Sequence, residues 1–345
     1  MKAPLSELLE SILGGRGLTF DQAREIAGSM LRGELDDVSI AALLVALRAR
    51  GERAEVVAGF ASSLRESCLR VDTEGLDPID TAGTGGDGAH TINASTAAAI
   101  VAASLGVKVL KHGNRGVSSR SGSADFIEAL GYPINHGPRE ASCILARAGF
   151  AFLFAPAYHP AMKRVMPVRR RLGIRTVFNL VGPLANPGMV KRQVLGVASM
   201  SLAPVMAEAG SLLGYEKLLI VHGEPGIDEV SVSGDTIFYE AGKGGVERYK
   251  LSPRDLGVAR TYPLSELRVE SPSESVERFL RTARGEGREA DAAFIAVNAA
   301  AALYVAGAVK DLRDGVETAL QALRDGVVYD FIERLREVAR GCMVG

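Results

Sequence analysis

The sequence has almost no net charge, few cysteines and no long, strongly apolar run. Its 345 residues carry 40 Lys and Arg against 41 Asp and Glu, which gives a formal net charge of −1. This balance disfavours a dedicated nucleic-acid binder, because such a protein needs surplus cations to displace counterions from phosphates. The 47% apolar and 23% charged residues exclude a disordered, coiled-coil or collagen-like chain. The length predicts roughly two domains.

The three cysteines, Cys68, Cys143 and Cys342, lie far apart in the sequence. Their wide spacing and odd number indicate neither a disulfide framework nor a set of metal ligands. We therefore expect each to be a small core or surface residue in a reducing compartment.

One stretch, residues 292–309, carries no charged side chain. It is mostly alanine and is interrupted by Asn298 and Gly307, and alanine supplies little transfer energy, so it predicts a buried core helix rather than a membrane span. The N-terminus carries acidic residues where a signal peptide would be apolar. These observations predict a cytoplasmic protein.

The first 70 or so residues show helical periodicity without strand signals. Leu5, Leu8, Leu9 and Ile12 share one helix face. Thr19 and Gln22 form a capping-box pattern at the start of a second helix, and two more helical segments follow. This predicts a small α-helical domain over residues 1–72, with an apolar surface that needs a partner.

From residue 77 onward, short strands alternate with glycine-rich loops and helices. The strand candidates are PIDTAG, VKVLKHG, AFLFAPA (151–157), QVLGVAS and KLLIVHG, and residues 229–250 alternate like an antiparallel excursion at a sheet edge. This order is typical of a mainly parallel sheet flanked by helices. It predicts a large α/β domain over residues 73–345, with ligands bound at the carboxyl ends of the strands.

The first glycine-rich loop, DTAGTGGDG at 80–88, precedes Ser95 and Thr96 at the start of a helix. Missing Cβ atoms let backbone N–H groups approach an anion, and a helix N-terminus favours negative charge. The loop is neither a Walker A motif nor a dinucleotide motif, and it could also be a plain turn with Ser95 as an N-cap. Asp87 would repel a phosphate, so it fits sugar hydroxyls, loop N–H groups or a metal.

The second loop, KHGNRGVSS at 111–119, also follows a strand and precedes a helix. Lys111, Arg115, Ser118, Ser119 and Ser123 are donors suited to phosphate oxygens, although Lys111 and Arg115 could be ordinary surface charges. Two neighbouring donor-rich loops predict one ligand with phosphate groups at both ends.

Two further segments carry charged side chains suited to ligands. Residues 169–175 hold four arginines, which form either an exposed helix face or a clamp for a small carboxylate. Asp228 and Glu229 follow a predicted strand, where adjacent carboxylates can bind Mg²⁺ shared with a substrate phosphate.

These motifs together resemble anthranilate phosphoribosyltransferases of tryptophan biosynthesis. The matching segments, in order, are GTGGDG at 83–88, N-x-S-T at 93–96, KHGNR at 111–115, S-x-x-SGSAD at 118–125, HP-AMK at 159–163, the R-x-x-LG-x-RT-x-FN-x-x-GPL-x-NP run at 169–187, and G-x-DE at 226–229. Ile92, Ala94 and Gly116 are mild departures.

The resemblance implies transfer of a phosphoribosyl group from phosphoribosyl pyrophosphate (PRPP) to the amine of anthranilate. It implies two Mg²⁺ ions held by Ser95, Asp228 and Glu229. It also implies a homodimer through the helical domain, with part of segment 163–185 folding back onto that domain. Because the aryl amine is neutral at pH 7, we expect no acid or base residue, with Arg169, Asn114 and Lys111 positioning the reactants. His112 could be argued as a general base, but a packing or hydrogen-bonding role is the prediction. The implied anthranilate contacts are Gly83, His112, Asn114 and Arg169. The implied PRPP contacts are Gly83, Gly86, Asp87, Thr91, Asn93, Ala94, Ser95, Thr96, Lys111, Asn114, Ser119 and Ser123.

Two alternatives remain at this point: a pyrimidine nucleoside phosphorylase-like enzyme of the same fold, and a non-catalytic nucleic-acid-binding relative. The first would carry an extra C-terminal domain. The second would be basic and would lack the Asp228–Glu229 pair.

Overall fold

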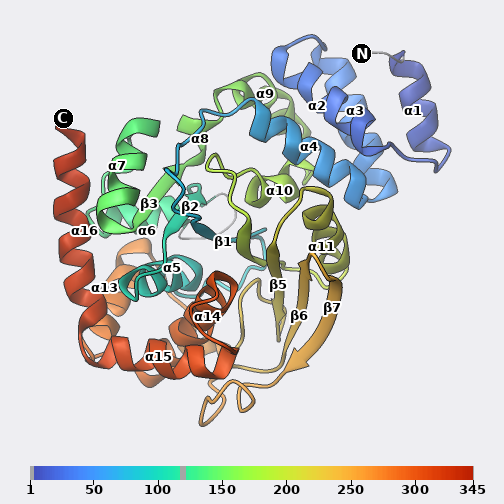
Figure 1. Ribbon diagram of the computed structural model, residues 1–345. Coiled ribbons are helices and arrows are strands. Elements are labelled where there is room, and N and C mark those ends of the chain that lie inside the picture. The colour runs from blue at the N-terminus through green and yellow to red at the C-terminus, as the bar shows by residue number, and fades with distance from the viewer. Residues whose placement is uncertain (1–3, 117–121, 345) are drawn as a thin grey trace.

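The computed structural model describes residues 4–116 and 122–344 (Figure 1). Its first part is helical throughout: α1 (Leu5–Leu13), α2 (Phe20–Arg32), α3 (Asp37–Arg50) and α4 (Ala54–Glu66). The predicted capping box opens α2, because Thr19 Oγ1 accepts from the Gln22 N–H and Gln22 Oε1 accepts from the Thr19 N–H. Asp36 caps α3 more simply, because its side chain accepts from the Ser39 N–H at 2.7 Å. Helices α2 and α3 therefore begin at residues suited to capping.

A seven-stranded sheet forms the second part, in the order β3-β2-β1-β4-β5-β6-β7. The five neighbouring strands β3, β2, β1, β4 and β5 pair in parallel, and β6 and β7 add an antiparallel edge. This arrangement confirms the predicted fold class. The strands are β1 (Ile79–Gly83), β2 (Val109–Gly113), β3 (Phe150–Phe154), β4 (Arg192–Gly196), β5 (Lys217–Gly223), β6 (Thr236–Gly242) and β7 (Gly245–Leu251).

Helices pack around this sheet (Figure 1). They are α5 (Ala94–Ser104), α6 (Ser123–Ala129), α7 (Pro138–Ala148), α8 (Ala155–Tyr158), η1 (Pro160–Arg164), α9 (Met166–Leu172), α10 (Phe178–Val181), η2 (Gly182–Leu184), α11 (Leu202–Leu212), α12 (Leu264–Leu267), α13 (Pro272–Ala283), α14 (Glu289–Ala306), α15 (Leu312–Arg324) and α16 (Val327–Met343).

Helix α14 is the core helix expected from the uncharged stretch. Within the described ranges it is the single helix long and apolar enough to cross a bilayer, but most of it is buried inside the protein. It packs on α5, α15 and strands β1, β4 and β5. Its alanines allow this close approach, so the prediction of a core helix is confirmed.

A buried polar network joins α4 to the sheet. Arg65 donates to the Leu184 carbonyl and to the Tyr215 hydroxyl, both at 2.7 Å, and Tyr215 donates to Gln193 Oε1 in β4 at 2.6 Å. Segment 163–185 also contacts the helical part, for example through the rings of Phe60 and Phe178, whose centroids lie 5.4 Å apart. These contacts join the helical part to the α/β part through α4 and segment 163–185.

Two expectations need correction. Cys143 in α7 and Cys342 in α16 form a disulfide with a Cα–Cα distance of 6.0 Å, so the prediction of three unpaired cysteines is wrong. The two residues are 199 positions apart, and only the packing of α16 along α7 brings them together. The strand expected over 151–157 ends at Phe154, because Pro156 stands in the first turn of α8, where its missing N–H costs nothing.

Candidate active site

The two glycine-rich loops follow neighbouring strands of the sheet. Strand β1 pairs in parallel with β2, so the loop after Gly83 and the loop after Gly113 leave the same edge of the sheet. Strand β5 ends at this edge too, and the loop after it carries Asp228 and Glu229. The strand order therefore brings together three segments that are far apart in the sequence.

The first loop has the backbone of an anion-binding turn. Gly85, Gly86 and Gly88 all have positive φ angles, which side chains with a Cβ rarely adopt. The loop ends at Asn93, whose side chain accepts from the Thr96 N–H at 3.2 Å and caps α5. Since Asn93 is the cap, the alternative of Ser95 as an N-cap is wrong, and the Ser95 hydroxyl is left for other partners.

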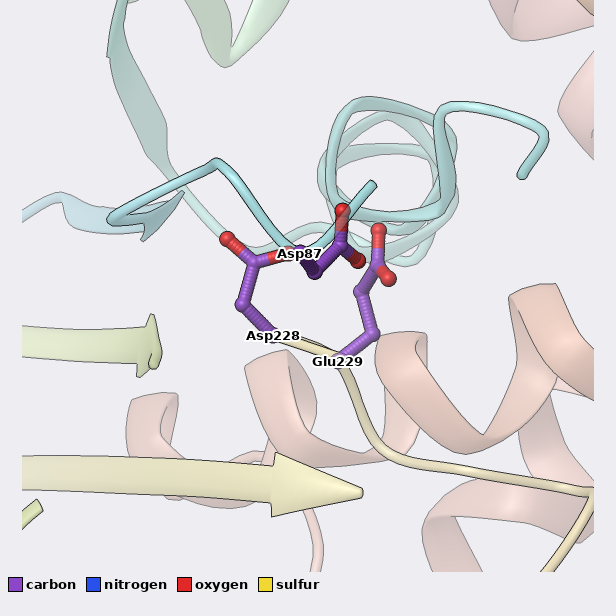
Figure 2. A group of neighbouring side chains, drawn as sticks. All are labelled: Asp87, Asp228 and Glu229. Carbon is purple, nitrogen blue, oxygen red and sulfur yellow. The ribbon is translucent and has the colours of Figure 1, made fainter. Parts of the chain in front are cut away.

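Three carboxylates converge beside this loop. Asp87, Asp228 and Glu229 each place one carboxylate oxygen within 4.8 Å of the other two. Figure 2 shows that the three side chains approach one another from two loops. Burial, and then repulsion by its neighbours, raises the pKa of Asp228, and the same two causes raise the pKa of Glu229 well above its usual range. Glu229 Oε2 is buried without a hydrogen-bond partner. Such a crowded, underpaired acidic cluster fits a divalent cation.

The cluster is tied to the loop and to Ser95. The Gly85 N–H donates to Asp228 Oδ2 at 2.7 Å, and a Cβ on Gly83 would lie 2.3 Å from that oxygen. Ser95, Asp228 and Glu229 line one small cavity together with Thr81 and Asn298. The structure thus brings the three predicted metal ligands to one place and adds Asp87 to them.

Lys111 reaches the same place from β2. Its Nζ atom is buried and donates to the Thr81 carbonyl, to Thr81 Oγ1 at 3.2 Å and to Ser95 Oγ at 3.5 Å. Burial lowers the pKa of Lys111 to about 8, although Asp80 and Glu229 oppose this shift. The ammonium therefore faces the cluster rather than solvent, contrary to the alternative that it is a surface charge.

Asp80 is a site residue that sequence reasoning missed. Its fully buried carboxylate accepts from the Thr81 and His112 N–H groups at 2.7 and 3.2 Å and from the Asn186 amide at 2.8 Å. Burial raises the pKa of Asp80 to about 6, while Lys111 opposes the shift. In the sequence, the signal for this buried role was a charged residue inside the predicted strand PIDTAG. Through these hydrogen bonds, Asp80 of β1 connects β2 with Asn186 in a single buried cluster.

The second loop presents a smaller set of donors. Asn114 is exposed, and its carbonyl accepts from the Ala124 N–H and from Ser123 Oγ. Arg115 is ion-paired with Asp125 and Glu128 at 3.0 and 2.8 Å, so its guanidinium is engaged at the surface. Ser118 and Ser119 lie outside the described residues.

Two buried histidines stand behind this loop. The rings of His112 and His159 meet edge to face with centroids 5.0 Å apart, and His159 belongs to the HP-AMK motif. Burial lowers the pKa of His112 well below its usual range and lowers that of His159 to about 4. His112 Nε2 and both ring nitrogens of His159 lack partners in the part of the chain that is described. Neutral rings of this kind shape a wall rather than carry charge.

Arg169 in α9 has no carboxylate partner among the described residues. Its guanidinium lies over the Phe178 ring, 5.5 Å from the centroid, and is 3.4 Å from Asn179 Oδ1. Partial burial lowers the pKa of Arg169, yet an arginine stays charged at neutral pH. Arg170 and Arg171 are exposed, and Arg175 donates to the Thr84 and Gly85 carbonyls. The four arginines thus divide into an unpaired guanidinium, two surface charges and a contact to the first loop.

Some predicted contacts are covered by the protein. Ala94 and Thr96 are fully buried, and Thr96 Oγ1 has no hydrogen-bond partner. Thr91 is partly buried and forms an isolated bridge with Arg268. For Ala94 and Thr96, access of a ligand would require the loop to move or would involve backbone groups alone.

Comparison with known proteins defines first the class and then the family. Residues 6–68 match the helical bundle domain of a glycosyl transferase family, and residues 76–329 match its a/b domain. An anthranilate phosphoribosyltransferase from Aeropyrum pernix is 54% identical over 334 residues, which cover 97% of this chain and 96% of that protein. One from Geobacillus kaustophilus is 45% identical over 96% of this chain and 97% of its own length.

Two solved structures of anthranilate phosphoribosyltransferases superpose on nearly the whole of this chain. The anthranilate phosphoribosyltransferase of Thermus thermophilus superposes with a TM-score of 0.90 at 41% identity, covering 96% of this chain and 99% of that one. That of Saccharomyces cerevisiae, solved in complex with PRPP and Mg, superposes with a TM-score of 0.89 at 28% identity, covering 98% of both chains. The chain belongs to the anthranilate phosphoribosyltransferase family, a group of pentosyltransferases. The two alternative functions gain no support from these relatives.

Proposed function

We propose that this protein transfers the 5-phosphoribosyl group of PRPP to the amine of anthranilate and releases pyrophosphate, a step of tryptophan biosynthesis. The observation that carries the proposal is the convergence of two glycine-rich strand–helix loops and a three-carboxylate cluster at one sheet edge. One activated sugar carries both a diphosphate and a monophosphate, and so needs two anion sites and a cation close together.

The diphosphate end of PRPP fits the first loop and the metal cluster. Gly83 and Gly86 supply backbone without side chains, Asn93 caps the helix that follows, and Lys111 and Ser95 add polar groups. We expect two Mg²⁺ ions, held by Ser95, Asp228 and Glu229, with Asp87 facing them or the ribose hydroxyls. When bound, Mg²⁺ would neutralise the charge that develops on the departing pyrophosphate. The remaining PRPP contacts that we propose are Thr91, Ala94, Thr96, Asn114, Ser119 and Ser123.

In this proposal, Arg169 binds the carboxylate of anthranilate. An unpaired guanidinium over an aromatic ring suits a planar aromatic carboxylate, which it can hold by two parallel hydrogen bonds. The other anthranilate contacts that we propose are Asn114, Gly83 and the buried His112. Holding the carboxylate orients the amine toward the sugar and turns a bimolecular encounter into an aligned one.

The chain supplies positioning rather than proton transfer. The aryl amine of anthranilate is neutral at pH 7 and already nucleophilic. The lowered pKa keeps the buried His112 ring neutral, and in our proposal it packs beside the substrate. Lys111 and the loop N–H groups stabilise negative charge on the leaving group as the sugar becomes oxocarbenium-like.

We also propose a cytoplasmic homodimer that associates through the helical domain. Large apolar side chains are exposed on α1 and α3: Leu13, Val38 and Val45 are 55%, 79% and 42% exposed. A cavity of about 700 Å³ lies nearby, lined by charged residues of α1, α2 and α4. Neither glycine-rich loop lines it, nor do Asp228 and Glu229, so we assign it to the surface of this domain and not to catalysis.

The test is a fluorescence assay on the purified protein. Mixing it with anthranilate, PRPP and Mg²⁺ should quench the fluorescence of anthranilate as the amine is phosphoribosylated. Omitting PRPP or Mg²⁺ should abolish the change. Unchanged fluorescence in the complete mixture, together with phosphorolysis of a pyrimidine nucleoside, would replace the proposal with the phosphorylase alternative.

A further inference from the structure

Helix α14 carries one polar side chain in its apolar middle. From Ala292 to Leu303, every residue is apolar except Asn298, which is only 6% exposed. A buried amide is costly unless each of its polar atoms has a partner. The partners of Asn298 therefore indicate what the residue does.

Asn298 makes a two-point contact with the backbone of Val230. Its Oδ1 accepts from the Val230 N–H at 2.9 Å, and its Nδ2 donates to the Val230 carbonyl at 3.0 Å. The second Nδ2 hydrogen goes to the Phe294 carbonyl at 2.9 Å, one turn earlier in α14. Both donors are thus engaged, and the amide is anchored in its own helix while it holds the loop.

Val230 directly follows Asp228 and Glu229. These carboxylates repel each other and Asp87, so nothing in their mutual electrostatics keeps them together before a cation arrives. Asn298 lines the same small cavity as Asp228, Glu229 and Ser95. It attaches the loop to a helix that packs against β1, β4 and β5, the strands on either side of the site.

We propose that Asn298 is a positioning residue that holds Asp228 and Glu229 in place for the divalent cation. This inference rests on the proposed metal site. In this proposal Asn298 acts through the Val230 backbone, to which its oxygen and one amide hydrogen are bonded. Groups that orient metal ligands in this way commonly contribute about 10-fold or more to metal affinity.

The substitution that tests this is Asn298→Ser. A serine in a helix can bond to the carbonyl four residues earlier, so it keeps the Phe294 contact and loses both Val230 bonds. The readout is Mn²⁺ binding in the presence of PRPP, followed by the electron paramagnetic resonance signal of free Mn²⁺. We expect binding about 10-fold weaker than in the wild type. The KM for anthranilate at saturating Mg²⁺ should not change.

The matched control is Leu303→Ala. Leu303 is equally buried in α14 and lies about 140° round the helix from Asn298. It should lower thermal stability and leave Mn²⁺ binding unchanged. If Asn298→Ser does not fold, Asn298→Gln is tested instead. The longer glutamine side chain displaces the amide, so that it cannot bond to both the N–H and the carbonyl of Val230, and this variant should also bind Mn²⁺ more weakly.

Wild-type Mn²⁺ affinity in a folded Asn298 variant would overturn the inference, and so would equal weakening by Leu303→Ala. Asp228→Asn separates this result from failure of the metal site itself. If the wild type binds no Mn²⁺ with PRPP, or if Asp228→Asn binds it undiminished, the proposed metal site is wrong and this inference falls with it.

Discussion

The backbone carbonyl of Asp228 lies directly against the Cα of Gly196. A Cβ at Gly196 would stand 1.6 Å from that oxygen, which no real contact allows. Gly196 ends β4 and pairs with Gly83 of β1, where a Cβ would stand 2.3 Å from Asp228 Oδ2. Two strand ends without side chains thus make the space in which the loop of Asp228 and Glu229 sits.

Gly196→Ala should therefore displace Asp228. Because the obstacle is backbone, relief requires the whole loop to shift, and overpacking of this kind costs about 1–3 kcal/mol. We expect a lower free energy of unfolding in denaturant titrations and a much higher Mg²⁺ requirement. Gly244→Ala is the control, since a Cβ there meets nothing within 4 Å. Normal Mg²⁺ dependence in Gly196→Ala would contradict the packing that we describe.

Arg169→Ala should raise the KM for anthranilate and leave that for PRPP nearly unchanged. Loss of a charge-assisted carboxylate contact costs about 1.5–3 kcal/mol, or roughly 10- to 100-fold. Steady-state kinetics with each substrate varied in turn provide the measurement. Arg170→Ala, an exposed neighbour in α9, should change neither constant. Equal loss of affinity for both substrates would remove Arg169 from the anthranilate site.

Replacing Asp228 with Asn and Glu229 with Gln together should abolish Mg²⁺-dependent turnover. The same double variant should be more stable than the wild type in chelator, because the pKa of each acid is raised by burial and repulsion that the amides lack. Turnover and thermal unfolding in the presence of chelator measure the two effects. Undiminished turnover would reject the metal role of this pair.

His159 should make the protein less stable in mild acid. Burial lowers its pKa from 6.5 to about 4, so between these values the unfolded chain binds a proton that the folded chain does not. Stability from this residue is therefore present above about pH 6.5 and is lost towards pH 4, by at most about 3 kcal/mol. His159→Phe should flatten the pH dependence of the unfolding free energy over this range. An unchanged slope would show that the ring is not held neutral.

The Cys143–Cys342 disulfide should stabilise the chain against unfolding. It links residues 199 positions apart and so restricts the unfolded state, an effect of typically about 2–4 kcal/mol. Reductant should lower the denaturation midpoint of the wild type, and Cys143→Ser with Cys342→Ser should abolish this sensitivity. Cys68→Ser should retain it, because Cys68 is free. A midpoint that reductant does not move in the wild type would argue against the bond.

Much of the fold could be predicted because its signals are local. Caps at Thr19 and Asp36, the alternation of strand, glycine-rich loop and helix, and the antiparallel excursion before residue 251 all depend on neighbours within a few positions. The motifs likewise predicted the family. The disulfide could not be predicted, because the spacing of two cysteines says nothing about which helices pack side by side.

Local patterns in the sequence were enough to place most helices and strands, the anion-binding loops and the residue types available for the chemistry. That Asp87 joins Asp228 and Glu229, that Asp80 is buried beside Lys111, and that Asn298 holds Val230 could be seen only in the folded chain. These contacts depend on strand order and helix packing, which local patterns do not encode. Asp87 and Asp228 are more than a hundred positions apart in the sequence. They become neighbours only because β1, β4 and β5 lie next to one another in one sheet.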